Sequence, residues 1–355
     1  MEDHNEMLKF YFRWPDAILD AIQRSQELPS LTKPSLLAVI GMGGSAIGGD
    51  LLRDLLYNQS DVPIYTCRDY HLPAWVGPNS LVIAVSYSGN TEETLMAFSE
   101  AFKRGCKLVA ITSGGILGQL CTELKVPIVR IPKGYPPRAA LPYLFIPMCV
   151  LGERVGLAKG LIDQAKKAAK TLRSMLVSIR EKAKRIAKRL VGTIPVIYGF
   201  GIFKSVAYRL KTQFNENSKV PSFANWFPAL NHDEVVGWEG EEELLEKFSV
   251  ILIRSQDEPL EIKRRIELTR EVALHKVSEI LEIWSKGKTP LEQMMSVLLL
   301  GEIASICLAL LRRVDPLKVR TIDIIKKHML ELQFSEDIRR RLLKLQGRYK
   351  VTITL

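Results

Sequence analysis

The strongest constraint on the fold of this chain is an alternation of short apolar segments with stretches long enough to form helices. The apolar, β-branched segments lie at residues 36–41, 62–67, 81–86, 107–112 and 127–131. Strands that are apolar throughout are typical of parallel sheets covered on both faces, because neither face of such a strand meets water. Helix-start signals stand between them, such as Ser45 before an apolar stretch and Glu92 and Glu93 in a first turn. The first half is therefore predicted to be a doubly wound α/β domain.

The same alternation begins again in the second half. Strand-like segments recur at residues 194–199, 219–224, 248–254 and 277–283. The stretch VIGMGGSAIGGDLLRDLL of the first half aligns loosely with VIYGFGIFKSVAYRLKTQF of the second, each with a strand, a Gly-x-Gly turn and a helix. We therefore predict two copies of one α/β unit, with closing helices over residues 289–330. The predicted domains are residues 1–155 and 191–330, joined by a helical connector at 156–190 and followed by a charged extension at 331–355.

The composition excludes several classes of protein. Of the 355 residues, 47% are hydrophobic and 25% are charged, which is typical of a globular protein and not of a disordered one. The five cysteines are dispersed, so we expect buried reduced thiols with no disulfide framework and no metal site. Residues 1–15 carry charges throughout, unlike a secretory signal. The longest apolar run, residues 294–311, contains Glu302, which is costly in lipid, and is predicted to be a buried helix. We expect a cytoplasmic protein that does not act on a membrane.

The net charge of +11 suits either nucleic acid or an anionic metabolite. Its distribution favours the metabolite. The basic residues are concentrated at 165–189 and 312–350, where the pattern predicts helices with a solvated basic face. Neither segment has the interleaved aromatic residues of a single-strand binder, so no nucleic-acid partner is expected.

A glycine-rich turn, GMGGSA at residues 41–46, follows the first predicted strand. It fits the G-x-G-x-x-A pattern of dinucleotide-binding proteins, so an NAD(P)-dependent enzyme is one interpretation. A turn that serves only close packing of a strand against a helix is the other.

A second motif, SYSGNTEET at residues 86–94, follows the strand LVIAV and opens a predicted helix. The hydroxyls of Ser86, Ser88 and Thr91 surround a glycine where helix N–H groups are unpaired and the helix dipole is positive. A phosphate monoester needs several short donors that converge on its oxygens. We predict that this loop binds a phosphate group; a helix-capping cluster is the alternative. The segment SQDE at residues 255–258, at the end of the corresponding strand of the second half, has no S-x-S-x-x-T pattern and is predicted to have lost this chemistry.

Together, GMGGSAIGGD and SYSGNTEET resemble the sugar isomerase (SIS) domain, which holds the phosphate of phosphosugars. In the second half, KTQFNENSK, PALNHDEVVGWEG and VDPLKVRTIDIIKKHML resemble the bifunctional phosphoglucose/phosphomannose isomerases of archaea and some bacteria. The resemblance covers the chain up to about residue 330. It implies two doubly wound, parallel-sheet SIS domains in tandem, joined by a helical connector. It also implies that Gly44 and Ser45 bind phosphate together with Ser86, Ser88 and Thr91.

The resemblance further implies a metal-independent and cofactor-independent aldose–ketose isomerisation through a cis-enediol. Glu216 matches the base that moves a proton between C1 and C2. Arg138 matches the cation that stabilises the enediolate charge. His232 and Lys326 match the residues that open the sugar ring, although the neighbouring Lys327 leaves the register of the lysine open.

In this family the histidine reaches the active site of the neighbouring subunit, which implies a homodimer with shared active sites. The predicted function is interconversion of glucose 6-phosphate, mannose 6-phosphate or both with fructose 6-phosphate. The alternative is a non-catalytic, phosphosugar-binding regulator. Such a regulator would keep Ser45, Ser86, Ser88 and Thr91 but would need no acid–base residues.

Overall fold

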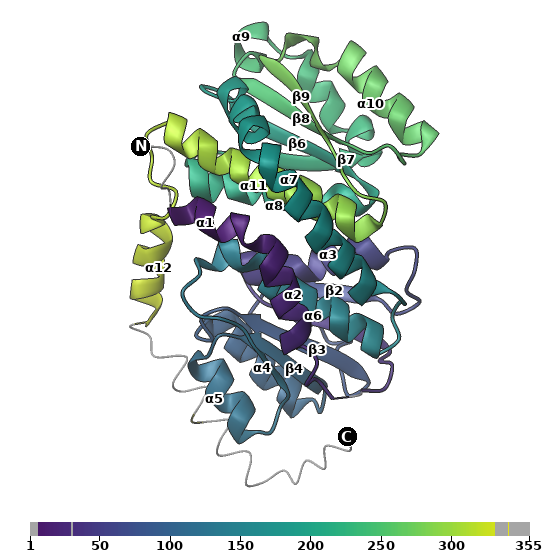
Figure 1. Ribbon diagram of the computed structural model, residues 1–355, viewed down its shortest axis with the longest axis vertical. Coiled ribbons are helices and arrows are strands. Elements are labelled where there is room, and N and C mark those ends of the chain that lie inside the picture. Colours follow the sequence, from purple (N-terminus) through teal and green to yellow (C-terminus); the bar gives the residue numbers. More distant parts are fainter. Residues whose placement is uncertain (1–5, 30, 331–339, 341–355) are drawn as a thin grey trace. The chain divides into compact units, whose positions relative to one another are not determined.

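The computed structural model describes residues 6–29, 31–330 and 340, and these residues form two compact units (Figure 1). The β1–β5 unit comprises residues 16–165 and the described residues from Val319 onward. The β6–β9 unit comprises residues 166–318 and the described residues up to Pro15. The units differ from the predicted division at both ends. Helix α1 (Glu6–Phe12) packs on helix α11 (Pro290–Leu311) and joins the second unit, and the described residues from Val319 onward join the first. Apart from Arg340, the predicted extension at 331–355 lies outside the described residues.

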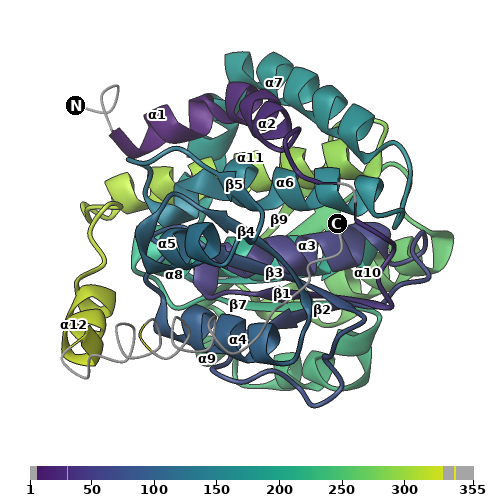
Figure 2. The same cartoon turned by 90° about the horizontal axis from the view of Figure 1, so that it is seen from below.

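The β1–β5 unit contains a five-stranded, fully parallel sheet in the order β2-β1-β3-β4-β5 (Figure 2). Every residue of β1 and β3 is buried, as their uninterrupted apolar sequences predict. The parallel sheet of the first half is thus confirmed. Its strands are β1 (Leu36–Ile40), β2 (Ile64–Cys67), β3 (Ser80–Ser86), β4 (Lys107–Thr112) and β5 (Ile128–Arg130).

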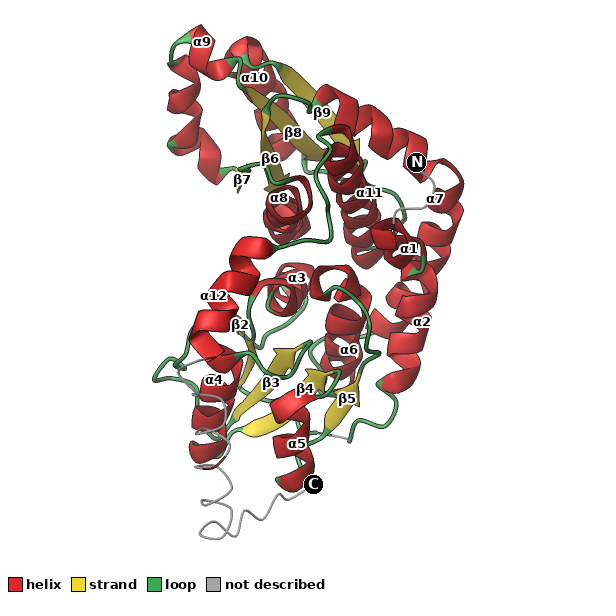
Figure 3. Ribbon diagram, turned by 90° about the vertical axis from the view of Figure 1, so that its left-hand side faces the viewer, coloured by secondary structure: helices red, strands yellow, loops and turns green. Residues whose placement is uncertain are grey.

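Helices cover both faces of this sheet (Figure 3). One face packs against α4 and α5 in a shared apolar cluster, and the other side carries α3, which contacts α6. The sheet is therefore doubly wound, as predicted. The helices are α2 (Trp14–Arg24), which begins in the other unit, α3 (Ile47–Leu56), α4 (Glu92–Lys103), α5 (Gly115–Glu123), α6 (Leu141–Arg154) and α12 (Arg320–Leu330).

The β6–β9 unit contains a second parallel sheet, in the order β7-β6-β8-β9. Strand β7 begins at Phe223, later than predicted, because Lys219 ends the preceding helix in the left-handed conformation, at φ +54°. The strands are β6 (Ile194–Phe200), β7 (Phe223–Phe227), β8 (Phe248–Arg254) and β9 (Glu279–Trp284). The helices are α1 (Glu6–Phe12), α7 (Leu161–Arg189), which begins in the other unit, α8 (Lys204–Ser218), α9 (Glu242–Leu245), α10 (Leu260–Val272) and α11 (Pro290–Leu311).

The two glycine turns that align in sequence also share a backbone conformation. Gly43 and Gly201 follow β1 and β6 with φ of +50° and +48°, a conformation that residues with a side chain rarely adopt. A side chain on Gly41 would lie 2.9 Å from the carbonyl oxygen of Val85, and one on Gly199 would lie 2.3 Å from that of Phe203. Both turns therefore need glycine for the same two physical reasons, and the internal repeat predicted from the sequence is present in the structure.

Helix α11 is the core helix of its unit. It is long and apolar enough to cross a membrane, but 89% of its most apolar window is buried within the structure. A capping box starts it, in which the Thr289 hydroxyl accepts from the Glu292 N–H while the Glu292 carboxylate accepts from the Thr289 N–H. The closing segment at residues 289–330 is helical, as predicted. It is broken after Leu311, where Arg313 takes φ +57° and Pro316 follows, and it resumes as α12.

Candidate active site

The loop after β3 brings three hydroxyl groups to the N-terminus of α4. The Ser86 and Thr91 hydroxyl oxygens lie 2.9 Å apart, and the Gly89 N–H donates to Ser86 Oγ at 3.0 Å. Ser86 is buried, Thr91 is half-buried and Ser88 is exposed. Thr91 is the N-cap residue, yet its side chain makes no capping hydrogen bond to α4. The first N–H groups of α4 are therefore left for another acceptor, which is the arrangement that binds phosphate at a helix N-terminus.

The loop is held in place by the start of α5. Gly89 has φ +74°, and a side chain there would overlap the carbonyl oxygen of Gly114, 1.8 Å away. The Gly89 carbonyl accepts from the N–H of Leu117 at 2.8 Å, and Asn90 Oδ1 accepts from the N–H of Ile116 at 3.0 Å. These contacts preorganise the hydroxyl groups, so binding an anion requires little reordering of the loop.

Tyr87 links this loop to two other segments, and the sequence reasoning missed it. Its N–H donates to Ser45 Oγ at 3.3 Å, which joins the loop to the glycine turn after β1. Its hydroxyl donates to the carbonyl of Pro132 at 2.9 Å and accepts from the N–H of Tyr135 at 2.7 Å. Burial raises the pKa of the Tyr87 hydroxyl, so the group remains a donor at neutral pH. A large aromatic residue among small hydroxyl residues is the one sequence signal that marks it.

Arg138 lies next to the glycine turn. It belongs to the 3₁₀ turn Pro137–Ala140, which contacts the 3₁₀ turn Gly43–Ser45. The Arg138 residue is only 5% exposed, whereas a solvated loop arginine would be open to water. The fold thus brings Arg138, Gly44 and Ser45 into one corner of the β1–β5 unit.

One carboxyl group in this region has a shifted pKa. Glu92 is buried in the first turn of α4, and burial, reinforced by the neighbouring charge of Glu93, raises its pKa.

Glu216 lies in the last turn of α8, in the β6–β9 unit, and is half-buried. The chain turns sharply after it at Lys219, whose ammonium group donates to the carbonyls of Glu216, at 2.7 Å, and of Asp315, at 2.8 Å. The backbone that carries Glu216 is therefore tied to the segment that follows α11. This constraint positions a potential base better than a freely moving helix end would.

A buried ion pair fixes α8 against α11. Arg209 Nε donates to Glu302 Oε1 at 2.9 Å, and both side chains are almost completely buried. Burial raises the pKa of Glu302 although Arg209 opposes the change, and the nearby charge of Glu216 raises it further. The network continues through Asn217, whose side-chain amide donates to Ser305 Oγ at 2.9 Å. Breaking it would leave uncompensated polar groups in the core between α8 and α11.

His232 and Lys326 are both exposed, and no hydrogen bond or ion pair among the described residues joins either to another predicted site residue. His232 ends the 3₁₀ turn Ala229–His232, just after the edge strand β7. Lys326 lies on α12 beside the equally exposed Lys327, so their exposure does not settle which of the two is the family's lysine. Their roles therefore stay predictions.

The loop after β8 has contacts of another kind. Arg254 donates to Glu258, from Nε to Oε2 at 3.1 Å, and to Glu282 Oε1 at 2.7 Å. The Ser255 N–H also donates to Glu258 Oε2, at 3.3 Å. The side chains of Arg254 and Glu258 are 5% and 3% exposed. A carboxylate of the chain itself therefore takes the donors of this loop.

Neither metal nor thiol chemistry has an evident place in the part of the chain that the structure describes. No group of three His, Cys, Asp or Glu residues there is close enough to hold a metal ion. All five cysteines are buried free thiols, and burial raises the pKa of Cys106 to about 11 and that of Cys121 to about 12. Such thiols are inert at neutral pH.

Comparison with known proteins gives three findings. A family model described as the bacterial phospho-glucose isomerase C-terminal SIS domain matches residues 179–329. A bifunctional phosphoglucose/phosphomannose isomerase of Caldicellulosiruptor bescii is 38% identical over 305 residues, which cover 84% of this chain and 90% of that protein. A D-glucosamine-6-phosphate 4-epimerase of Sulfolobus acidocaldarius is 33% identical over 236 residues, covering 64% of this chain and 72% of its own length.

The fold also matches a solved structure. The C-terminal domain of glucosamine-fructose-6-phosphate aminotransferase from Francisella tularensis has a TM-score of 0.69 to this chain at 14% identity. The match covers 88% of this chain and 98% of that one, so the two share the same α/β fold.

Proposed function

The chain belongs to the family of bifunctional phosphoglucose/phosphomannose isomerases and is a phosphosugar isomerase, and we propose that it interconverts glucose 6-phosphate and mannose 6-phosphate with fructose 6-phosphate. The observation that carries the proposal is the hydroxyl cluster of Ser86 and Thr91 at the uncapped N-terminus of α4. This cluster, with Ser88, Gly44 and Ser45, holds the 6-phosphate, which all three sugars share.

The proposed chemistry is a proton transfer between neighbouring carbon atoms. The Glu216 carboxylate takes the proton from C2 of the open-chain aldose, which leaves a cis-enediol with negative charge on an oxygen atom. The guanidinium of Arg138 stabilises that charge. Glu216 returns the proton to C1 while the proton of the O2 hydroxyl passes to O1, which gives the ketose. Atoms and electrons balance without an added oxidant or reductant. Glu216 is half-buried, and its charge acts on the buried Arg209–Glu302 pair, which supports its role as the base.

Ring opening is assigned to His232 and Lys326, which protonate and deprotonate the ring oxygen and the C1 hydroxyl. We propose that His232 acts in the active site of a second copy of the chain, within a homodimer. Its exposure and its lack of partners among the described residues support this assignment. The exposed apolar side chains of Phe223, Trp226 and Val236, on and after the edge strand β7, supply a surface that a second copy could cover.

A coupled assay tests the function. Glucose 6-phosphate and mannose 6-phosphate should each yield fructose 6-phosphate, with EDTA present throughout. Glucosamine 6-phosphate is supplied in parallel and its product identified by NMR, because epimerisation at C4 is the second candidate, favoured by the relationship to the 4-epimerase. Turnover of glucosamine 6-phosphate alone would replace the isomerase proposal with the epimerase, and phosphosugar binding without turnover would indicate a regulator.

Mixing two inactive variants tests the shared site. Glu216→Gln and His232→Ala chains are co-expressed, so that about half of the dimers are mixed and each mixed dimer has one site with both native residues. The expected result is recovery of about a quarter of the wild-type activity. If both residues served the site of their own chain, no activity would return. A monomeric active enzyme in light scattering would also contradict the shared site.

A further inference from the structure

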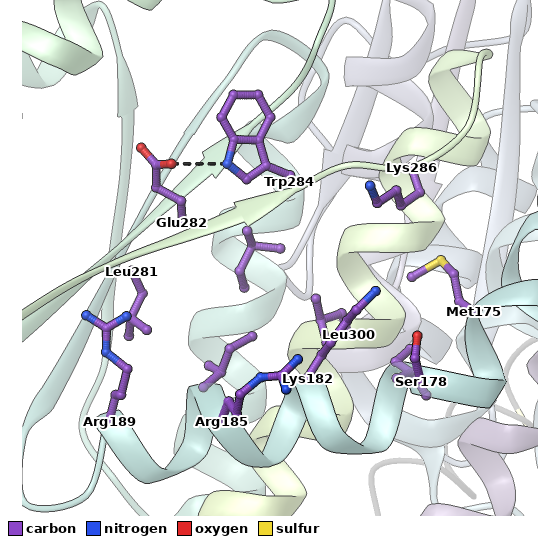
Figure 4. A pocket seen from close by; sticks show the side chains of 13 residues that line it. Met175, Ser178, Lys182, Arg185, Arg189, Leu281, Glu282, Trp284, Lys286 and Leu300 are labelled. Atoms are coloured by element: carbon purple, nitrogen blue, oxygen red, sulfur yellow. Dashed lines mark hydrogen bonds between the residues drawn. The ribbon is translucent and has the colours of Figure 1, made fainter.

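The β6–β9 unit contains a cavity of about 430 Å³ at the edge of its sheet (Figure 4). Helix α7, strand β9 and residues at and before α11 line it. It exists because the sheet ends there: the first sheet continues beyond β4 to β5, whereas no strand in the described part of the chain pairs with the outer edge of β9. Its volume lies within the range of small-molecule sites.

Three cations line this cavity without an acidic partner. Lys182 and Arg185 project from α7, and Lys286 stands on the opposite side, between β9 and α11 (Figure 4). Across the described residues, none of the three side chains makes an ion pair or a hydrogen bond. The acidic residue of the lining, Glu282, is already bound to Arg254 and therefore does not neutralise them. Like charges around one cavity repel one another unless an anion enters it.

The floor of the cavity is apolar. Leu281 and Ile283 of β9 and Leu300 of α11 are buried, and Ile179 and Ile186 of α7 are buried beside them. A hexose phosphate would set its hydroxyl groups against this surface without partners. The floor instead suits a ligand with a flat or apolar body.

We propose that this cavity binds an organic phosphate that carries two or more negative charges and an apolar or aromatic ring. The phosphate lies against Lys182, Arg185 and Lys286, and the ring lies on Leu281 and Leu300. The site is separate from the hydroxyl loop after β3, which belongs to the other unit. It goes beyond the proposed isomerase activity, because its lining does not match the substrates of that reaction.

Calorimetric titration of the full chain with ATP tests the site, because ATP combines several negative charges with an aromatic base. ATP should bind, and Lys182→Glu and Lys286→Glu should each weaken its binding by about 10-fold or more, since each removes one charged contact. Lys188→Glu is the matched control. It makes the same charge change on the same helix but lies outside this cavity, so ATP affinity should stay within about 2-fold of wild type.

Further probes separate the parts of the proposal. Ser88→Ala/Thr91→Val should bind ATP with wild-type affinity. If that variant lost ATP binding while Lys182→Glu kept it, ATP would bind at the hydroxyl loop and the proposal would be overturned. Adenosine that binds as tightly as ATP would show that phosphate is not recognised. Pyrophosphate that binds as tightly would show that the apolar floor is not used. Absence of ATP binding at millimolar concentration would also overturn the proposal. Melting curves confirm that the variants remain folded; all the substituted positions are exposed except the half-buried Thr91.

Discussion

The loops after β3 and β8 follow corresponding strands of the two sheets, but their hydrogen-bond donors are satisfied differently. After β3, the hydroxyls of Ser86 and Thr91 cluster at the N-terminus of α4, and no side chain caps that helix end. After β8, the Glu258 carboxylate accepts from both Arg254 and the Ser255 N–H. One loop leaves donors for an external anion, whereas the other binds an anion that the chain itself supplies.

The difference shows how a repeated fold can divide its functions. A parallel α/β unit places unpaired donors at the carboxyl ends of its strands, and those donors must be satisfied by a ligand, by water or by the chain. Hydrogen bonding to Glu258 raises the pKa of Arg254 although burial opposes it, so the internal anion is held as a stable ion pair. Fold alone therefore does not fix which half binds substrate; a few side chains do.

The largest expected effect comes from Glu216, which we assign to chemistry rather than to substrate binding. Glu216→Gln keeps the length of the side chain but cannot accept the proton, so kcat should fall by at least about 10²-fold with little change in KM. Steady-state kinetics with glucose 6-phosphate measure both constants. Glu271→Gln, at an exposed position of α10, is the matched control and should leave them unchanged. Near-normal turnover and normal solvent-tritium exchange at C2 in Glu216→Gln would assign the base to another residue.

The next effect tests the open loop. Ser88→Ala combined with Thr91→Val removes two hydroxyl donors and should raise KM by about 10-fold or more, since each hydrogen bond to a charged group contributes about 1.5 kcal/mol or more. Steady-state kinetics would show most of the change in KM rather than in kcat. Ser255→Ala in the loop after β8 is the comparison variant, and its KM should match that of wild type. An unchanged KM in the double variant would remove the loop after β3 as the phosphate site.

The smallest effect on activity is expected from the closed loop. Glu258→Ala leaves Arg254 buried with only Glu282 as a partner, so the free energy of unfolding should fall by about 2 kcal/mol or more. KM should not change, because this loop does not hold substrate. Urea denaturation measures the loss, and Arg254→Met/Glu258→Leu should recover part of it by removing both charges together. If Glu258→Ala raised KM as strongly as the Ser88→Ala/Thr91→Val variant does, the two loops would not differ in function.

Local patterns in the sequence were sufficient for much of the fold. Strands β4 and β8 agree with their predicted bounds because each contains four consecutive apolar residues that end at a polar residue, Thr112 or Arg254. Strand β7 begins later than the sequence predicts because its start depends on how α8 ends at Lys219. The left-handed conformation of Lys219 cannot be predicted from the apolar pattern. Helix α1 was not predicted, because its place is set by α11, far along the chain.

Some features of the candidate site also follow from local sequence, and others do not. The clustering of Ser86, Ser88 and Thr91 could be predicted because the three lie within six positions at the end of one strand, where the next helix begins with unpaired N–H groups. Arg138 was reached only through family resemblance. Its burial beside the glycine turn depends on a contact between segments far apart in the chain. The role of Tyr87 in joining Ser45 to the loop had no local signature beyond its size.

By itself, then, the sequence determined the parallel α/β class, the internal repeat and the cluster of hydroxyl residues after β3, because the apolar period, the glycine turns and the hydroxyl spacing each act over a few residues. Only the tertiary structure decided the rest. It buried Arg138, closed the loop after β8 with Glu258, and left a cavity with unpartnered cations beside β9. These features depend on which distant segments meet, and the energies of burial and charge pairing arise only once they do.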